Sequence, residues 1–435
     1  MWRERGGRAD RAPSYDADAR LAIVTSSEAF PSGSFLRYWR ADAVSGLGTY
    51  VTLFALQTLV VLTLHGSAED VGWLKAAQFL PYLVFGLVVG AVVDGRRRLP
   101  LMISTDLAQA VLLLTIPVLW WRGLLSMPTL LIVVLALGTA SVVNVAAAMS
   151  LLPRLVEPQQ LQPAHARIDG ADAVSTTAGP AVGGLLVAAI GAPLAVLVDS
   201  LTYVYSALTL RRLDLDEPPP RTGVTAKGLL HEVLEGIRWI YRGSGLSTLE
   251  ISTHAWFVGN AIMGVVLAPY ILGELDLTAF QFGIIGAAGG VGAVLGATIT
   301  TRVGRRLGTG RTIVACHIVT TLGVTVMVFA GRGMGTAATV AVLVVGQGLY
   351  GLAMGMSNSH QMSYRQLVTP DALQARTNTT LRSLNRGVIV VVAPVAGIVA
   401  DAWGIRPTMV LAAVIFALVA AGLGATSFRD ARAPA

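Results

Sequence analysis

Charged residues and cysteines are scarce in this chain of 435 residues. Lys, Arg, Asp and Glu together make up 13% of it. Soluble domains carry about 25% charged residues, so this chain has too little charge to cover the surface of two or three such domains. The one cysteine, Cys316, excludes an internal disulfide. These shortages exclude a soluble enzyme, a secreted disulfide scaffold, a coiled coil and a disordered chain.

Signatures of the common enzyme classes are also missing. The chain has no Gly-x-x-x-x-Gly-Lys phosphate loop, no His-Glu-x-x-His and no pair of cysteines. The run nearest to a Gly-x-Ser-x-Gly elbow, Gly355-Met-Ser357-Asn-Ser359, lacks the final glycine. We therefore expect no enzymatic activity, no cofactor and no metal site.

Apolar residues, by contrast, are abundant: they make up 54% of the chain, alongside 47 glycines, and the mean hydropathy is +0.65. A helix that spans a lipid bilayer needs about 20 apolar residues. Apolar runs separated by glycine, proline or charge therefore predict twelve spans. They lie at about 42–64, 71–93, 101–121, 127–151, 165–190, 193–210, 247–272, 279–301, 311–330, 335–361, 376–402 and 407–427.

The basic residues alternate in number from loop to loop. With a cytoplasmic N-terminus, 28 of the 32 fall in cytoplasmic segments, and Lys75, Arg122, Arg332 and Arg406 fall on the other side. Such an excess is typical of cytoplasmic loops, and it accounts for the net charge of +7 without a nucleic-acid partner. The pattern predicts a multi-pass protein of the plasma membrane with an even number of spans and both termini in the cytoplasm.

A polar, proline-rich break at 211–245 divides the spans six and six, and its second half has the pattern of a short amphipathic helix. The two halves also repeat: Leu, Val, Pro, Leu and Gln coincide between LVEPQQLQPA at 155–164 and LVTPDALQAR at 367–376. Parallel repeats of this kind are typical of two-bundle secondary transporters. The predicted units are a cytoplasmic tail at 1–34, a six-helix bundle at 35–210, the linker at 211–245, a second bundle at 246–428 and a tail at 429–435.

Two loop and helix motifs resemble those of the major facilitator superfamily. The first is Gly90-Ala-Val-Val-Asp94-Gly95-Arg96-Arg97-Arg98, in which Gly95 replaces an arginine whose role would pass to Arg96. The second, Gly179-Pro180-Ala-Val-Gly183-Gly184, resembles the end of the antiporter signature in span 5. Ser45-Gly-Leu-Gly48, Leu152-Pro153-Arg154-Leu155-Val156 and Asp199 resemble, more closely, the branch that holds enterobactin and macrolide exporters.

The resemblance implies an all-α integral membrane protein. Its twelve transmembrane helices would form two six-helix bundles related by a parallel pseudo-two-fold, with spans 2 and 11 adjoining, as well as spans 5 and 8. A transporter needs gate contacts that form in one state and not in the other. We therefore expect two cytoplasmic gates, Asp94 with Arg382 or Arg386, and Asp169 or Asp172 with Arg302 or Arg305. The alternative is that these arginines fix the topology and reach lipid headgroups.

Ionisable side chains within spans are candidates for proton coupling, because they are costly in lipid. They are Asp106, Asp199, Glu250 and Asp42. Counting residues places none of them at the midplane, so the coupling residue stays open, and each has a structural role as its alternative.

In the family's arrangement, spans 1, 4, 7 and 10 line the substrate cavity. Their polar and aromatic residues are Thr49, Thr52, Gln57, Asn144, Trp256, Asn260, Gln347, Tyr350 and Asn358. This largely uncharged set suits an amphipathic organic molecule. The chain is thus predicted to be a monomeric, proton-coupled exporter of a small hydrophobic or amphipathic compound. The alternatives are an exporter of a self-made metabolite such as a siderophore, and a non-transporting sensor or scaffold.

Overall fold

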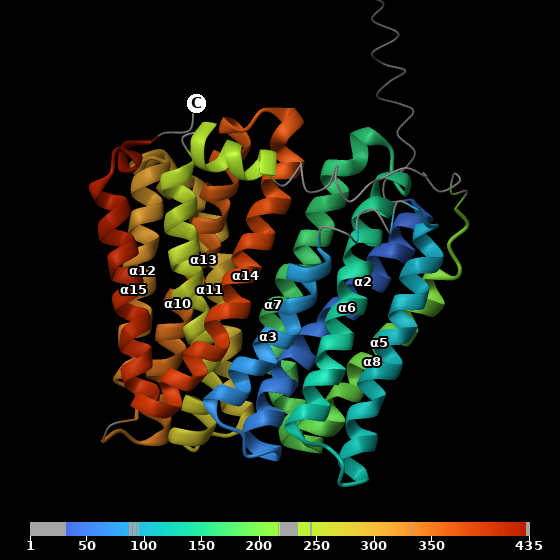
Figure 1. The fold of residues 1–435 in the computed structure, drawn as a ribbon, viewed down its shortest axis with the longest axis horizontal. Coiled ribbons are helices and arrows are strands. Elements are labelled where there is room, and N and C mark those ends of the chain that lie inside the picture. Colours follow the sequence, from blue (N-terminus) through green and yellow to red (C-terminus); the bar gives the residue numbers. More distant parts are fainter. Residues whose placement is uncertain are drawn as a thin grey trace, which may run out of the picture.

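The computed structural model describes residues 32–431 apart from 87–88, 90–92, 94, 216, 218–233, 244–245 and 332. Helices stand side by side in two groups, one from each half of the chain (Figure 1). The first group comprises α2 (Gly33–Thr58), α3 (Ala68–Phe85), α5 (Arg98–Trp121), α6 (Met127–Leu151), α7 (Leu161–Ile190) and α8 (Ala192–Leu210). The second comprises α10 (Ser247–Ala268), α11 (Ala279–Leu307), α12 (Thr309–Val328), α13 (Thr336–Val368), α14 (Asp371–Trp403) and α15 (Ile405–Ala425). The all-helical prediction is confirmed.

Short irregular turns extend several of these helices. Leu59–Thr63 and Pro269–Glu274 are π-helical ends of the first helix of each group, and Trp239–Gly243 is a π-helical turn before α10. Leu152–Arg154, Pro158–Gln160 and Ser427–Asp430 are 3-10 turns.

Glycines make two of the tightest connections. Gly191 joins α7 to α8 and Gly404 joins α14 to α15, with φ of 82° and 95°. A side chain is strained at such angles, and glycine is not, so one residue can both end a helix and start the next.

Eleven of the described helices are long and apolar enough to cross a membrane. The helix α3, at the position of the predicted second span, does not meet that criterion by itself, because Glu69, Asp70 and Lys75 interrupt its apolar sequence. The prediction of twelve spans is thus confirmed for eleven helices, and the crossing by α3 stays a prediction. Of the predicted amphipathic helix, Leu229, Leu230 and Val233 lie outside the described residues, while residues 234–238 are helical.

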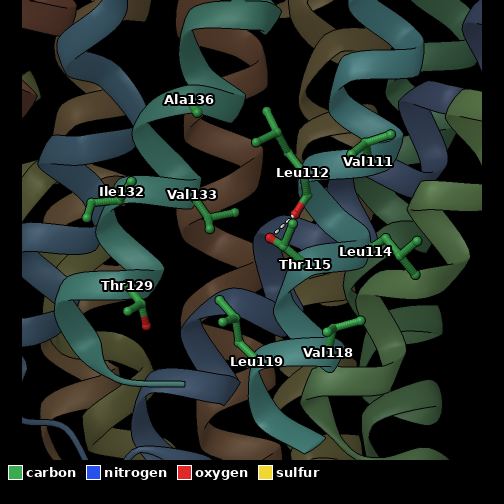
Figure 2. Close-up of a pocket in the computed structure, with 10 residues that line it drawn as sticks. All are labelled: Val111, Leu112, Leu114, Thr115, Val118, Leu119, Thr129, Ile132, Val133 and Ala136. Atoms are coloured by element: carbon green, nitrogen blue, oxygen red, sulfur yellow. Dashed lines mark hydrogen bonds between the residues drawn. The ribbon is translucent and has the colours of Figure 1, made fainter. Parts of the chain in front are cut away.

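Large apolar side chains cover the outer faces of both groups. Trp121 is 79% exposed, Ile132 69% and Leu418 66%. A groove of about 540 Å³ between α5 and α6 is lined by Val111, Leu114, Ile132 and their neighbours (Figure 2). Such surfaces are unfavourable in water and suit hydrocarbon. The groove lies on this apolar outer face, so we do not count it as a candidate functional site.

The described chain begins at the start of α2 and ends after α15. Both points lie at the same end of the helix groups (Figure 1). We call this the terminal end and the opposite one the far end. The two groups contact each other through α3 with α14 and α7 with α11. Several of the closest contacts involve the first turns of α3 and α11, which lie at the far end, and another joins Thr177 to Gly290 further along α11.

Candidate functional site

The antiporter motif lies where α7 crosses α11. A Cβ on Gly184 would lie 2.7 Å from the carbonyl oxygen of Ala279 and 2.9 Å from Cα of Gly283. Contacts this short are not tolerated by side chains, so glycine allows the two backbones to touch. The neighbouring Gly179 and Gly183 face Tyr50 and Phe54 of α2 instead, where they set the packing within the first group.

A second close approach joins α3 to α14. Gly72 lies against the backbone of Ala393 and Pro394, and Gly397 lies against Ala68 and Glu69. Pro394 and Gly397 repeat the spacing of the span 5 motif. Both glycine contacts are in the far-end part of the interface.

A carboxylate completes this contact. The Oδ1 and Oδ2 atoms of Asp401, at the end of α14, accept hydrogen bonds from the backbone N–H groups of Ala68 and Glu69 at 3.1 and 3.0 Å. These N–H groups have no backbone partner inside the helix, and that of Glu69 also donates to Ser67 Oγ at 3.1 Å. The helix dipole favours an anion there. Sequence reasoning missed Asp401, because its partner is a backbone end rather than a basic side chain.

The charges expected to close the terminal end are apart. Asp169 and Asp172 on α7 and Arg302 and Arg305 on α11 are exposed, and no ion pair joins them in the described part of the chain. Asp172 accepts a hydrogen bond from the Tyr50 hydroxyl at 3.1 Å instead.

Contact between α7 and α11 is close at Thr177 and Gly290. Arg302 lies 12 residues further along α11, which is about 18 Å of helix. The arginines of this gate therefore lie well beyond the contact on the terminal side.

The structure describes only some residues of the other expected gate, between Asp94 and Arg382 or Arg386. Asp94 lies outside the described residues, and Arg96 and Arg382 are exposed. The Arg386 guanidinium stacks 3.6 Å from the centre of the Tyr82 ring, across the interface between α14 and α3. Cation–π contacts of this kind hold a guanidinium without a carboxylate.

Two candidates for proton coupling are buried in the first group without a cation. Asp106 is 3% exposed and accepts hydrogen bonds from Asn144 Nδ2 at 2.6 Å and Ser206 Oγ at 2.7 Å. Asp199 is 1% exposed and accepts one from Thr202 Oγ1 at 2.9 Å. No basic side chain forms an ion pair with either carboxylate among the described residues. A third candidate, Asp42, is half-buried on α2.

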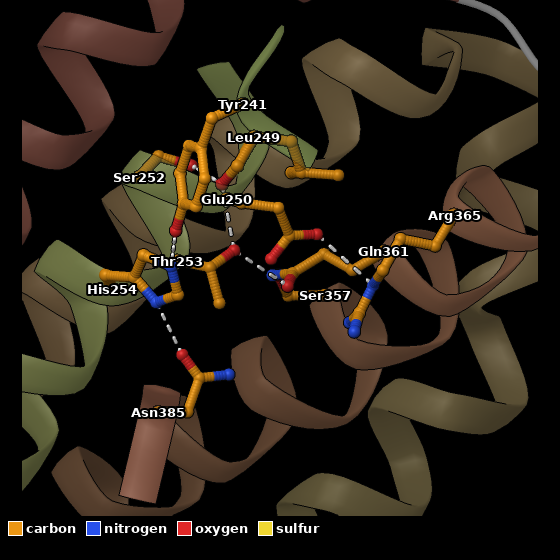
Figure 3. Close-up of polar contacts among 10 residues, drawn as sticks. All are labelled: Tyr241, Leu249, Glu250, Ser252, Thr253, His254, Ser357, Gln361, Arg365 and Asn385. Atoms are coloured by element: carbon orange, nitrogen blue, oxygen red, sulfur yellow. Dashed lines mark hydrogen bonds and ion pairs between the residues drawn. The ribbon is translucent and has the colours of Figure 1, made fainter. Parts of the chain in front are cut away.

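The fourth candidate, Glu250, has a cationic partner. It is fully buried on α10, and its carboxylate lies 3.3 Å from Nε of Arg365 on α13 (Figure 3). In the sequence analysis, Arg365 is one of the basic residues counted in cytoplasmic segments. Its pairing with Glu250 was missed because the two residues are 115 positions apart in the chain.

Further polar contacts surround that pair (Figure 3). Thr253 donates to Gln361 at 3.1 Å, and His254 contacts Asn385 of α14 at 2.7 Å and the Tyr241 hydroxyl at 2.5 Å. Burial raises the pKa of Tyr241, which precedes α10, so its hydroxyl keeps its proton. The cluster ties α10, α13, α14 and the segment before α10 together at the terminal end.

The nine residues predicted to line the cavity have different surroundings in the structure, and their place in a substrate cavity stays a prediction. Asn144 is occupied by Asp106, Thr49 bonds Tyr203 at 3.0 Å, and Asn358 is exposed. Thr52 is buried, Gln57 donates to the carbonyl of Leu53, and Gln347 packs on Gly289. Trp256, Asn260 and Tyr350 do meet: the Tyr350 hydroxyl donates to Asn260 Oδ1 at 2.6 Å, and the Tyr350 and Trp256 rings stack with centroids 6.2 Å apart.

Lys75 lies inside α3. It is half-buried, seven residues beyond Ala68 and within the second predicted span. Its assignment to the non-cytoplasmic side stays a prediction.

The chain resembles known transporters over most of its length. The profile of the family described as transmembrane secretion effectors matches residues 25–433. Macrolide efflux protein A of Streptococcus pyogenes is 26% identical over 260 residues, which are 57% of this chain and 63% of that protein. The multidrug efflux pump Tap of Mycobacterium tuberculosis (strain ATCC 25618 / H37Rv) is 28% identical over 281 residues, 61% of this chain and 66% of the pump. These matches thus span less than two thirds of each relative.

Solved structures show the same fold. A point mutant of the nucleoside transporter NupG has a TM-score of 0.75 at 11% identity, covering 90% of this chain and 99% of the other. A bacterial homologue of the iron transporter ferroportin has a TM-score of 0.70 in its inward-facing state, at 15% identity, covering 89% and 98% of the two chains. Its outward-facing state has a TM-score of 0.59, again at 15% identity, with 90% and 98% covered.

Proposed function

Because this chain belongs to the transmembrane secretion effector family of the major facilitator superfamily, we propose that it exports a small amphipathic compound in exchange for protons. The observation that carries the proton coupling is the burial of Asp106 and Asp199 with hydrogen-bond donors but no basic partner among the described residues. An ionised carboxylate in a low-dielectric interior costs several kcal/mol unless it is paired, and a bound proton removes that cost. Glu250 is a weaker candidate, because Arg365 neutralises its charge.

We further propose that transport proceeds by alternating access. Glycine contacts and Asp401 hold the two helix groups together at the far end, while the charges of α7 and α11 at the terminal end are apart. This arrangement is what an inward-facing state requires if the terminal end is cytoplasmic. The higher TM-score against the inward-facing ferroportin homologue than against its outward-facing state supports that assignment.

In this proposal, α3 completes twelve spans in two bundles related by a parallel pseudo-two-fold, and both termini of a monomer lie on the cytoplasmic side of the plasma membrane. The gate between α7 and α11 consists of the residues expected from the sequence. Asp169 and Asp172 pair with Arg302 and Arg305 when the protein faces outward. The names of the relatives, which refer to macrolides and multiple drugs, support an amphipathic substrate. The aromatic cluster around Trp256 and Tyr350 suits such a compound.

Proton coupling can be tested with purified protein in liposomes. An imposed proton gradient should drive accumulation of a radiolabelled macrolide, and a protonophore should abolish it. Asp199→Asn and Asp106→Asn, which keep the size of the side chain, should lower gradient-driven transport at least about ten-fold while counterflow without a gradient persists. Asp276→Asn, at an exposed far-end turn, is the matched control.

Two results would reject the proposal: transport that ignores the gradient in the unaltered protein, or full gradient-driven transport in both aspartate variants. A non-transporting scaffold would show neither accumulation nor counterflow.

A further inference from the structure

An unpaired cation lies in the interface between the two helix groups. Lys75 is one of two lysines in the chain, whose other 30 basic residues are arginines. Its side chain reaches across to α10, where a Cβ on Gly264 would lie 4.0 Å from its Cε. No hydrogen bond or ion pair joins the Lys75 ammonium to another residue in the described part of the chain.

Acidic residues near Lys75 on α3 are used elsewhere. The Asp70 carboxylate accepts from the backbone N–H of Ser67 at 2.9 Å, and Glu69 accepts from Trp73 Nε1 at 3.1 Å. Asp401 caps the start of the helix. None of them stands three or four residues from Lys75, the spacing at which side chains on a helix meet.

Arg406 and Arg122, two other basic residues assigned to the non-cytoplasmic side, differ from Lys75 in their surroundings. Arg406 pairs with Glu274 at 2.5 Å and donates to the carbonyl oxygen of Val328 at 2.8 Å. Arg122 is exposed at the end of α5, next to Trp121. Lys75 is therefore an exception, and an ionisable residue within a membrane span is a functional-site candidate by default.

A second polar group without a partner lies one turn away. Both side-chain polar atoms of the Gln78 amide, Oε1 and Nε2, are buried and have no hydrogen-bond partner among the residues that the structure describes. An orphaned amide of this kind costs about 1–3 kcal/mol. Lys75 and Gln78 are three residues apart, so both lie on one face of α3.

The opposite helix, α10, presents an aromatic, a polar and a small residue on one face. Trp256, Asn260 and Gly264 lie four residues apart on α10, and therefore on one face. Gly264 leaves room for the lysine stem, and Trp256 belongs to the aromatic cluster with Tyr350 and Phe416. A ligand whose anionic group lies at Lys75 would thus extend along α10 toward its terminal end and contact these aromatic rings.

We propose that Lys75 and Gln78 form a subsite that binds the carboxylate of an amphipathic, aromatic substrate, whose apolar part lies against the Trp256 face of α10. This rests on the proposed function as a transporter and adds amphipathic organic acids to the compounds that it would take. The ammonium and the Gln78 N–H donate to the carboxylate oxygens, which supplies the missing anion and satisfies the amide donor. A lysine that merely reached the far-end membrane surface would show no such selectivity.

The test uses dansyl-phenylalanine, a fluorescent aromatic acid, and its neutral methyl ester, with the full-length protein in nanodiscs. We expect the acid to bind at least about ten-fold more tightly than the ester, because a charge-assisted hydrogen bond contributes about 1.5–3 kcal/mol. Lys75→Gln should remove this preference and leave the ester affinity unchanged, and Lys75→Arg should keep it. Gln78→Leu should reduce acid binding about five-fold.

Arg122→Gln, which removes a positive charge near the same membrane surface but outside the interface, is the matched control and should keep the preference. Unchanged ester binding in every variant shows that the fold is intact. If the unaltered protein binds acid and ester alike, or binds neither, or if Lys75→Gln still prefers the acid, the subsite is refuted. Gradient-driven macrolide transport in the same preparation would then leave the proposed function standing. An acid preference without gradient-driven transport would refute that function instead.

Discussion

Asp401 in α14 caps the start of α3 across the boundary between the two helix groups, with its Oδ1 atom 3.1 Å from the backbone nitrogen of Ala68. The two residues are 333 positions apart in the chain. A carboxylate at a helix N-terminus contributes about 0.5–2 kcal/mol, and in the proposed alternating-access cycle this one does so only while the far end is closed. It is therefore a contact whose loss shifts the balance between two states rather than the stability of either group.

Asp401→Ala should shift the protein toward the state that is open at the far end. A loss of about 1 kcal/mol changes the ratio of two states about five-fold. Electron–electron distance measurements between spin labels at Leu124 and Met334, which are exposed at far-end turns of the two groups, would report the shift in a Cys316→Ser background. Asp401→Asn, which still offers one acceptor, should give a smaller change. An unchanged distance distribution in Asp401→Ala would show that the glycine contacts alone decide the state.

The proposed gate at the terminal end predicts a charge-swap rescue. Asp172→Arg should place like charges opposite Arg302 and Arg305 in the outward-facing state and lower transport, because a close repulsive pair disfavours that state. Restoring opposite charges with Arg302→Asp and Arg305→Asp should recover a large part of the rate. The measurement is macrolide counterflow in liposomes, with Arg311→Asp as a control for a charge change on the same surface. Equal rates in Asp172→Arg and the unaltered protein would mean that these charges fix the membrane topology and do not form a gate.

The buried pair of Glu250 and Arg365 predicts a stability defect rather than a coupling defect. Glu250→Gln leaves the Arg365 guanidinium, 14% exposed, without its anion, and breaking one side of a buried pair costs about 3–5 kcal/mol. The thermal unfolding midpoint should therefore fall sharply, and the double variant Glu250→Gln, Arg365→Met should recover much of the loss.

As a control for that experiment, Arg311→Gln removes the exposed pair with Asp430, which should change stability by less than about 1 kcal/mol. If Glu250→Gln unfolds at the same temperature as the unaltered protein but loses its response to the proton gradient, Glu250 belongs to the coupling machinery.

Local sequence was enough to place the helices. Apolar runs of about 20 residues, glycines at tight connections and the antiporter motif are properties of neighbouring residues, and each predicted span coincides with a helix. Several helices continue past the apolar run, as α2 does by beginning at Gly33, because polar residues outside the bilayer can extend a helix. The exception is α3, whose charges make it look less like a span.

Which polar residues meet was decided by tertiary structure alone. The hydrogen bond between Asn144 and Asp106 and the pair of Glu250 and Arg365 could not be predicted from the sequence. Periodicity and hydropathy depend on residues within a turn or two of each other, so the amino-acid sequence by itself determined a helical membrane protein in two halves, and its repeat and motifs indicated a transporter. The pairing of charges depends on how helices far apart in the chain pack together. That packing brought Asp401 to the start of α3 and left Lys75 facing α10 without an anion.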